Sequence, residues 1–476
     1  MNKISKCTLA LAMVLVSAFI TNQSAQAQTF ATLYSFCSEK DCKDGGEPYA
    51  GLIQGTDGNL YGTTEFGGTG SCSDVDGCGT AFKVSLSGAL TTLHRFVRST
   101  DGAEPIAGLA QATNGDLYGA ASVGGTNNGG TVFKVMPGGG FKVLHTFAGT
   151  DGSTPWGTPI LGTDGDLFGT TYEGGANGTG GTIFKITPGG TLTTLYSSVS
   201  IYWNPFAGLV QASNGDFYGM TQYGGSSACN NGCGTIFKFA DDTLTTVYSF
   251  AGQEGSPPWP YAPLVQGTTG DFYGMTEADG TDSSGTVFRV NTGGTNFKTL
   301  HSFDMGANPT SGLIQATDGN FYGTTNMDGA NEAGTIFKIT PSGTLTVLYN
   351  FCSQEGCTDG GDPNAGLIQD TNGNLYGTTY YGGANNRGVV FSLSIGLGPF
   401  VSTQINSGKV GAAVTILGTD LTGASGVAFN GIAASFTVVS ASEITTTVPT
   451  GATTGFIVVT TPGGTLTSNK VFTVKT

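Results

Sequence analysis

The feature of this sequence that most constrains its fold is a sevenfold repeat whose last copy lacks its final strand. Each copy holds a Tyr-Gly-Thr-Thr-like segment, then Gly-Thr-x-Phe-Lys, then a Leu-Tyr/His-Ser-Phe-like segment. The aromatic residue of the first segment recurs at Tyr61, Tyr118, Phe168, Tyr218, Tyr273, Tyr322 and Tyr376. The last copy stops after Phe391, and residues 30–36 (FATLYSF) supply the missing strand at the other end of the chain. Pairing the two ends predicts a closed seven-bladed β-propeller.

Composition supports an exported all-β chain of two domains. The 476 residues include 80 glycines and exceed the usual size of a single core. Residues 1–27 have two lysines, an apolar run and Ala25-Gln26-Ala27, a typical cleavage sequence, which together predict a signal peptide. Losing Lys3 and Lys6 changes the formal net charge from −15 to −17. This charge argues against nucleic acid and anionic lipid as partners, and no later stretch predicts a membrane span.

Eight cysteines of the mature chain fall into four close pairs. In an exported protein such pairs predict local disulfides, here between Cys37 and Cys42, Cys72 and Cys78, Cys229 and Cys233, and Cys352 and Cys357. A zinc site would need Cys-x-x-Cys pairs or histidines at ligand spacing. The three histidines all occupy one repeated strand, where tyrosine stands in other copies. We therefore expect no metal and no cofactor.

Two classes of connection carry the variation between the copies. They run from strand two to strand three and from strand four to the next strand one, and antiparallel pairing puts both on one face, which we call the link face. The opposite face carries the turns from strand one to two and from three to four, and we call it the turn face. A proline begins each re-entry into the repeat, and the residue after it varies: Tyr49, Ile106, Trp156, Phe206, Tyr261, Thr310 and Asn364. We call these seven residues the inner ring, and expect any ligand on their face.

A second variable position follows each Tyr-Gly-Thr-Thr-like segment. It holds Glu65, Ser122, Tyr172, Gln222, Glu277, Asn326 and Tyr380, which we call the outer ring. The outer ring should surround the mouth of the central channel. The expected ligand-binding residues are the aromatic ones of the link face: Tyr49, Trp156, Trp203, Phe206, Trp259, Tyr261, Tyr172 and Tyr380. Alternatively, the three tryptophans cap the core between neighbouring blades.

Catalysis has one set of candidates. If the chain is an enzyme, Glu65, Glu173 and Glu277 are its carboxylates near the channel mouth, because two carboxylates can hydrolyse a glycosidic bond. The alternative is that they are solvated surface acids. No histidine can serve a nucleophile on the link face, and no glycine-rich loop opens a helix, so triads and phosphate loops are unsupported.

The repeat ends near residue 396, and residues 399–476 predict a second domain. Short strands there predict an immunoglobulin-like sandwich. The strings GAAVTILGT (411–419), VAFNG (427–431), ITTTVP (444–449) and TPGG (461–464) closely resemble an IPT/TIG domain. The expected domains are thus a signal peptide (1–27), the propeller (28–396) and an IPT/TIG-like sandwich (399–476).

The repeats also resemble a known family. GLIQGTDGNLYGTTEFGG and GTIFKITPSGTLTVLYNF are similar to the GloVer tandem repeats of exported bacterial "choice-of-anchor" proteins. This resemblance implies a secreted or surface location and no established activity. The group's C-terminal anchor is missing from this sequence, so free secretion or retention in the periplasm is expected.

Two functional hypotheses follow from these patterns. The leading one is a secreted, monomeric, non-enzymatic binding or adhesion protein that presents an aromatic face to an extracellular glycan or protein. The alternative is an extracellular polysaccharide hydrolase or lyase that uses the carboxylates at the channel mouth. A purely structural role in the cell envelope is a third possibility, because propellers host unrelated activities.

Overall fold

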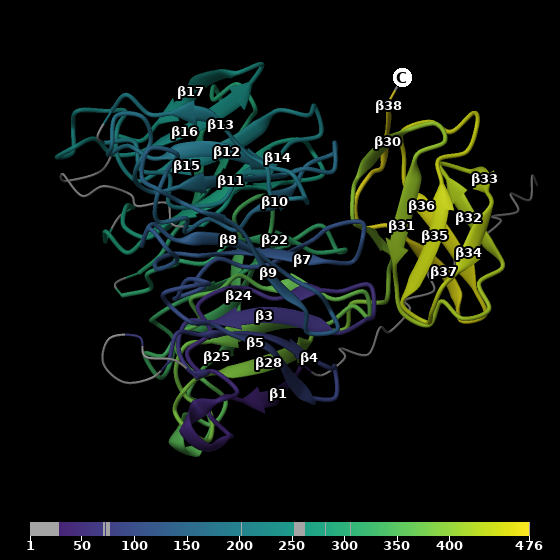
Figure 1. The fold of residues 1–476 in the computed structure, drawn as a ribbon. Coiled ribbons are helices and arrows are strands. Elements are labelled where there is room, and N and C mark those ends of the chain that lie inside the picture. The colour runs from purple at the N-terminus through teal and green to yellow at the C-terminus, as the bar shows by residue number, and fades with distance from the viewer. Residues whose placement is uncertain are drawn as a thin grey trace, which may run out of the picture.

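The computed structural model describes residues 28–69, 72, 77–200, 202–251, 262–280, 282–304 and 306–475 (Figure 1). The predicted signal peptide lies outside these residues. Within them the chain is all-β, with two short 3-10 turns, η1 (Lys40–Cys42) and η2 (Glu355–Cys357), and without an α-helix. None of the helices in the described residues is long and apolar enough to cross a membrane.

Seven four-stranded antiparallel sheets repeat along the described residues up to Ser394. Their strands are β2 (Ile53–Gln54), β3 (Leu60–Thr64), β4 (Thr80–Val84), β5 (Leu90–Arg95); β6 (Ala110–Gln111), β7 (Leu117–Ala121), β8 (Thr131–Val135), β9 (Phe141–Thr146); β10 (Ile160–Leu161), β11 (Leu167–Thr171), β12 (Thr182–Ile186), β13 (Leu192–Ser197); β14 (Val210–Gln211), β15 (Phe217–Thr221), β16 (Thr235–Ala240), β17 (Thr243–Ser249); β18 (Val265–Gln266), β19 (Phe272–Thr276), β20 (Thr286–Val290), β21 (Lys298–Ser302); β22 (Ile314–Gln315), β23 (Phe321–Thr325), β24 (Thr335–Ile339), β25 (Leu345–Asn350); and β26 (Ile368–Gln369), β27 (Leu375–Thr379), β28 (Val389–Ser394), β1 (Thr29–Ser35). We number these sheets one to seven in this order.

The seventh sheet joins the two ends of the repeat region. β1 pairs antiparallel with β28, from Thr29 opposite Ser394 to Ser35 opposite Val389, and Figure 1 shows the purple strand beside the green one. The register slips by one residue between Thr32 and Tyr34, and the same slip lies between strands three and four of the other six sheets. β1 therefore has the geometry of a fourth strand, in the place that the sequence predicts for it.

Each repeated sheet is stabilised by an aromatic ring packed over a glycine. In the first sheet Phe82 of β4 is fully buried, and its ring lies over Gly62 of β3 so closely that a Cβ there would approach the ring to 2.7 Å. The Oγ1 atoms of Thr64 and Thr80 lie 2.9 Å apart, which satisfies both buried hydroxyls. The Tyr61 hydroxyl donates to Asp57 in the turn between β2 and β3 (2.7 Å). The repeated motif thus supplies both the core of each sheet and its turn.

Glutamine side chains join neighbouring sheets on the turn face. The last residue of strand one accepts a hydrogen bond from a backbone N–H in the turn of an adjacent sheet, as Gln211 does from Thr163 (3.0 Å). Six sheets have this glutamine: Gln54, Gln111, Gln211, Gln266, Gln315 and Gln369. The bond from Thr371 N–H to Gln54 (3.1 Å) links the seventh sheet to the first. The third sheet has Leu161 in this position instead.

Four disulfides stiffen the link face. They join Cys37 with Cys42, Cys72 with Cys78, Cys229 with Cys233, and Cys352 with Cys357, which are the predicted pairs. Each closes a loop of a few residues within a connection from strand two to three or from strand four to the next strand one. This bonding fits an extracellular protein.

Residues after Ser394 form a separate β-sandwich (Figure 1, yellow). One sheet has the order β29-β31-β35-β34 and the other β33-β32-β36-β37, with a parallel pair β30-β38 at the side. The strands are β29 (Ser402–Thr403), β30 (Ser407–Lys409), β31 (Ala413–Leu417), β32 (Gly426–Phe429), β33 (Ile432–Ala434), β34 (Phe436–Val438), β35 (Glu443–Thr447), β36 (Ile457–Thr461), β37 (Gly464–Thr467) and β38 (Thr473–Lys475). Ile416, Phe429 and Phe472 lie in a core of their own.

The sandwich contacts the turn face of the repeated sheets. Ser442 Oγ donates to the Thr56 carbonyl (2.7 Å), and Lys475 Nζ donates to Thr163 Oγ1 (2.9 Å). Gln404 Nε2 donates to Gln111 Oε1 (3.2 Å) in the second sheet. The second sheet is the neighbour of the third sheet, which has Leu161 in place of the glutamine. The link face is the side that the sandwich leaves open.

Candidate ligand-binding site on the link face

A shallow cavity lies at the centre of the link face. It measures about 110 Å³ and is lined by the six inner-ring residues that the structure describes: Tyr49, Ile106, Trp156, Phe206, Thr310 and Asn364. The seventh, Tyr261, lies outside the described residues. Each of the six side chains is half-buried. Residues that are far apart in sequence but equivalent in the repeat thus share one cavity, because each follows the proline that begins a first strand.

Glycines below the inner ring keep the cavity shallow. A Cβ on Gly366 would lie 3.0 Å from the Gly312 carbonyl oxygen, and one on Gly51 would lie 3.2 Å from that of Gly366. The first strands therefore approach one another around the axis of the ring, as only residues without a side chain allow. The site is a surface depression and not a deep tunnel.

One sector of the cavity rim is aromatic. The Trp156 ring lies 4.3 Å from Tyr172 and 4.4 Å from Phe206 between centroids, with interplanar angles of 33° and 54°. The Tyr172 hydroxyl donates to Gln222 Oε1 (2.6 Å), which fixes the ring of Tyr172. These contacts hold a half-exposed apolar surface in a defined orientation, with a polar edge.

The opposite sector is acidic and phenolic. Burial raises the pKa of Glu65 to about 7, a hydrogen bond with Tyr380 opposes this shift, and the charges of Glu104 and Glu47 add to it. Burial, with the charges of Glu65 and Glu277, raises the pKa of Tyr49 to about 12. Glu65 is thus a carboxyl group that holds a proton near neutral pH, which is a property of general acids and of hydrogen-bond donors to polar ligands.

Amides and hydroxyls complete the rim. Thr310 Oγ1 lies 3.4 Å from Asn364 Oδ1, and Asn326 Nδ2 donates to the same oxygen. Apolar rings and amide groups therefore surround one depression, with the Glu65 carboxyl, whose pKa is raised, close behind the rim. Such a mixture can contact both the C–H and the O–H groups of a polyhydroxylated ligand.

The predicted ligand-binding residues separate into three groups. Tyr49, Trp156 and Phe206 line the cavity, and Tyr172 and Tyr380 contact the lining residues from the outer ring. Trp203 does not belong to the site, which corrects the expectation for it: only 7% of its surface is exposed, and it packs on Tyr196 and Phe237 in the core. Trp259 and Tyr261 lie outside the described residues.

The three predicted carboxylates do not act alike. The charges of Glu65 and Glu277 both raise the pKa of Tyr49, although the two follow strands of the first and fifth sheets and neither lines the cavity itself. Glu173 is exposed, beside Tyr172, and does not line the cavity. Among the described residues, no three His, Cys, Asp or Glu side chains lie close enough to hold a metal ion.

Sequence reasoning missed the charged pair behind the acidic sector. Glu47 pairs with Arg387, and Glu47 also contacts Tyr380 through a hydrogen bond. Glu47 and Glu104 occupy the position before the repeat proline, where other copies have Thr154, Asn204, Asn308 and Asp362. This position varies as the inner ring does, so a comparison of the copies could have identified it.

Two overlapping segments, 69–259 and 230–435, match the family model described as the Gloeobacter/Verrucomicrobia repeat. Together they cover well over half of the chain. The chain belongs to this repeat family. The second match runs past Ser394, where the repeats were expected to end, and into the sandwich. Membership of the Gloeobacter/Verrucomicrobia repeat family confirms the resemblance found in the repeats.

Solved structures similar to this Gloeobacter/Verrucomicrobia repeat protein differ in function. A fungal alcohol oxidase of the AA5 family, in complex with copper, has a TM-score of 0.51 at 11% identity, covering 94% of this chain and 99% of the oxidase. An oligogalacturonate lyase from Vibrio parahaemolyticus has a TM-score of 0.47 at 11% identity, covering 77% and 96%. At these identities the oxidase is informative about fold alone. No curated protein matches the sequence.

Proposed function

We propose that the seven repeated sheets are the blades of a closed β-propeller spanning residues 28–396. The pairing of β1 with β28 and the bond from Thr371 to Gln54 support this closure. In this proposal residues 1–27 direct export, and residues 399–476 form an IPT/TIG-like sandwich that serves as a spacer. The mature protein acts outside the cell or at its surface, in agreement with its four disulfides.

The protein's function in this proposal is non-enzymatic binding of an extracellular glycan at the centre of the link face. The cluster of Trp156, Tyr172 and Phe206 is the observation that carries it. Sugar rings have faces of C–H groups that pack on aromatic rings, and their hydroxyls need polar partners nearby. Glu65, Asn364 and Gln222 provide such partners around the same rim.

The small volume of the depression favours contact with part of a long polysaccharide over enclosure of a whole small ligand. Its volume of about 110 Å³ is well below the roughly 300–1,000 Å³ of sites that enclose small ligands. A polysaccharide would place one sugar unit or a short segment in the depression, and the rest of the polysaccharide would lie across the open link face. An adhesion or carbohydrate-binding role needs no more than this.

The test uses the mature chain, residues 28–476, in affinity gels that contain hydroxyethylcellulose, xylan, pectate, alginate or laminarin. We expect retardation by at least one polysaccharide without release of new reducing ends. Trp156→Ala should weaken the retardation about tenfold. The matched control is Tyr202→Ala, because Tyr202 is 42% exposed on the same face and does not line the cavity. Retardation that Trp156→Ala leaves unchanged would contradict the site.

A second candidate function rests on Glu65 alone. A carboxyl with a pKa of about 7 beside Tyr380 and Tyr49 can donate a proton to a leaving group at neutral pH. An extracellular polysaccharide hydrolase or lyase would use it with Glu277. In that case the gels would show release of new ends, and Glu65→Gln and Glu277→Gln would each abolish the release. Full turnover in both variants would exclude these residues as the acid and base.

A further inference from the structure

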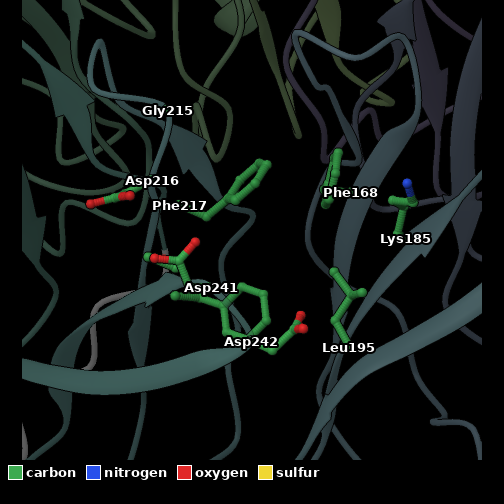
Figure 2. Close-up of a pocket in the computed structure, with 10 residues that line it drawn as sticks. Phe168, Lys185, Leu195, Gly215, Asp216, Phe217, Asp241 and Asp242 are labelled. Carbon is green, nitrogen blue, oxygen red and sulfur yellow. The ribbon is translucent and has the colours of Figure 1, made fainter.

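A second cavity, larger than the first, lies between the third and fourth sheets, on their turn-face side (Figure 2). It measures about 300 Å³. The third sheet contributes Phe168, Lys185 and Leu195, and the fourth contributes residues 215–217 and 239–242. None of these residues belongs to the link-face site, so this cavity can be considered independently of the proposed function.

A shortened hairpin opens this cavity. In the third sheet, five residues (187–191) join strands three and four, and Gly190 packs against the second sheet: a Cβ on it would lie 3.0 Å from the Leu144 carbonyl oxygen. Gly343 of the sixth sheet covers Leu300 in the same way. In the fourth sheet only Asp241 and Asp242 join β16 to β17. The repeat equivalent of Leu144, which is Leu195, is therefore left uncovered and lines the cavity.

Three phenylalanines, Phe168, Phe217 and Phe239, form the aromatic part of the cavity wall. The rings of Phe168 and Phe217 lie 4.3 Å apart between centroids, and Figure 2 shows both beside the open space. Phe217 is 9% exposed, whereas its repeat equivalents such as Leu60 and Phe321 are fully buried. Phe168 stands where the other six copies have tyrosine. The edges of these rings are thus slightly more exposed than their equivalents in the other sheets, and they border the cavity.

The charge around the cavity is negative. Lys185 is already paired with Asp166 (2.7 Å) and Asp164 (3.6 Å), and Asp216 is paired with Lys238 (3.5 Å). Asp241 and Asp242 make no ion pair within the described part of the chain. In Figure 2 their side chains lie across the cavity from Lys185. A ligand in this space meets aromatic rings and the carboxylates of Asp241 and Asp242, which have no ion-pair partner among the described residues.

We propose that this cavity binds a small organic ammonium ion with an apolar body. The rings would pack on the apolar body, and carboxylates and aromatic faces both attract a cation. An anion would be repelled by the two aspartates, and a neutral molecule of the same shape would gain only the apolar contact. The volume lies at the lower end of the range for small-ligand sites, which suits a compact amine.

The test is calorimetric titration of the full mature chain with phenethylammonium chloride. Its controls are 2-phenylethanol, a neutral molecule of similar shape, and 3-phenylpropionate, an anion. We expect the ammonium ion to bind at least tenfold more tightly than either control. Absence of binding by the ammonium ion, or equal binding of the alcohol, would overturn the proposal.

Two variants assign the binding to this cavity. The double variant Asp241→Asn with Asp242→Asn removes the charge, and asparagine tolerates the positive φ angles of 47° and 57° found there. It should weaken ammonium binding at least tenfold. Replacing residues 240–243 with Thr-Pro-Ser-Gly-Thr, the sequence of residues 340–344, restores the longer turn and should abolish binding. Undiminished binding in either variant, with an unchanged circular dichroism spectrum and urea unfolding midpoint as the folding control, would contradict the assignment.

Discussion

The two faces of the repeated sheets are built from the same strands but differ in what varies between copies. On the turn face, six of seven sheets use the same glutamine to contact a neighbouring sheet, and the sandwich covers part of this face. On the link face, the inner ring has a different residue in almost every copy. The uniform residues hold sheets together, whereas the variable ones surround an open depression.

This difference indicates which positions of a tandem repeat stabilise the fold and which are available for ligand contacts. A residue that makes the same contact in nearly every sheet holds neighbouring sheets together. A residue that differs from sheet to sheet is not needed for closure and is available to contact a ligand. Substitutions at the two kinds of position should therefore have different effects.

The largest effect is expected at the closure of the ring. Phe36 follows β1, is fully buried and lies 5.1 Å from Phe82 between ring centroids. Phe36→Ala should lower the free energy of unfolding by about 3–5 kcal/mol, through lost burial and the cavity left behind. The matched control is Tyr381→Ala on the link face, where the side chain is 45% exposed and the change should stay within about 0.5 kcal/mol. Urea unfolding measures both, and equal effects would remove the distinction between uniform buried positions and variable exposed ones.

The second effect concerns the acidic sector of the link face. The folded-state pKa of Glu65 is raised to about 7, so the protonated form is favoured in the folded protein. The stability that this proton provides is present below pH 4.5 and is lost as the pH rises through 7. Between pH 5 and pH 8, the free energy of unfolding of Glu65→Gln should therefore rise by about 2 kcal/mol relative to that of the original chain. This value is smaller than the full pKa shift would give, because the carboxyl group is partly exposed. Urea unfolding at both pH values tests this, and a pH-independent difference would contradict the raised pKa.

A smaller effect is expected from one glutamine of the turn face. Gln211 accepts from Thr163 N–H and donates to the Gly215 carbonyl (3.1 Å). Gln211→Ala should destabilise the chain by about 1–2 kcal/mol, because both backbone partners lose a hydrogen bond. Polysaccharide retardation should not change. A variant that loses retardation while keeping its stability would place ligand contacts on the turn face.

The smallest effect is expected where the sandwich meets the turn face. Ser442→Ala removes the hydrogen bond to the Thr56 carbonyl, which should cost about 0.5–1.5 kcal/mol. The sandwich has its own core, so its fold should persist. Limited proteolysis between residues 395 and 398 should become faster in the variant. Unchanged cleavage would show that this bond does not hold the sandwich in place.

Sequence periodicity could predict the repeated sheets because the period itself encodes them. The Tyr-Gly-Thr-Thr and Phe-Lys segments specify strands two and three, and the displaced strand at residues 30–36 specified the pairing of β1 with β28. The cysteine pairs were equally predictable from their spacing. These features depend on local sequence and on the equivalence of copies.

Whether a particular aromatic residue is buried in the core or lines the depression could not be predicted in the same way. Trp156 and Trp203 lie in equivalent kinds of connection, yet one lines the depression and the other packs in the core. The choice depends on side-chain packing between sheets, which periodicity does not encode. The sequence does contain a feature that indicates the cavity between the third and fourth sheets. Phe237 and Leu244 are one residue closer in sequence than Phe82 and Leu90, and that deletion shortens the hairpin.

The central claim, that the open link face is the binding face, is tested most directly by hydrogen exchange. The mature chain would be compared with and without an oligosaccharide of whichever polysaccharide the affinity gels retain. We expect slower exchange in the link-face segments around residues 47–51, 153–158 and 204–209, and no change in the turns around residues 55–59, 162–166 and 213–217. Protection of the turns, with the link face unchanged, would contradict this claim.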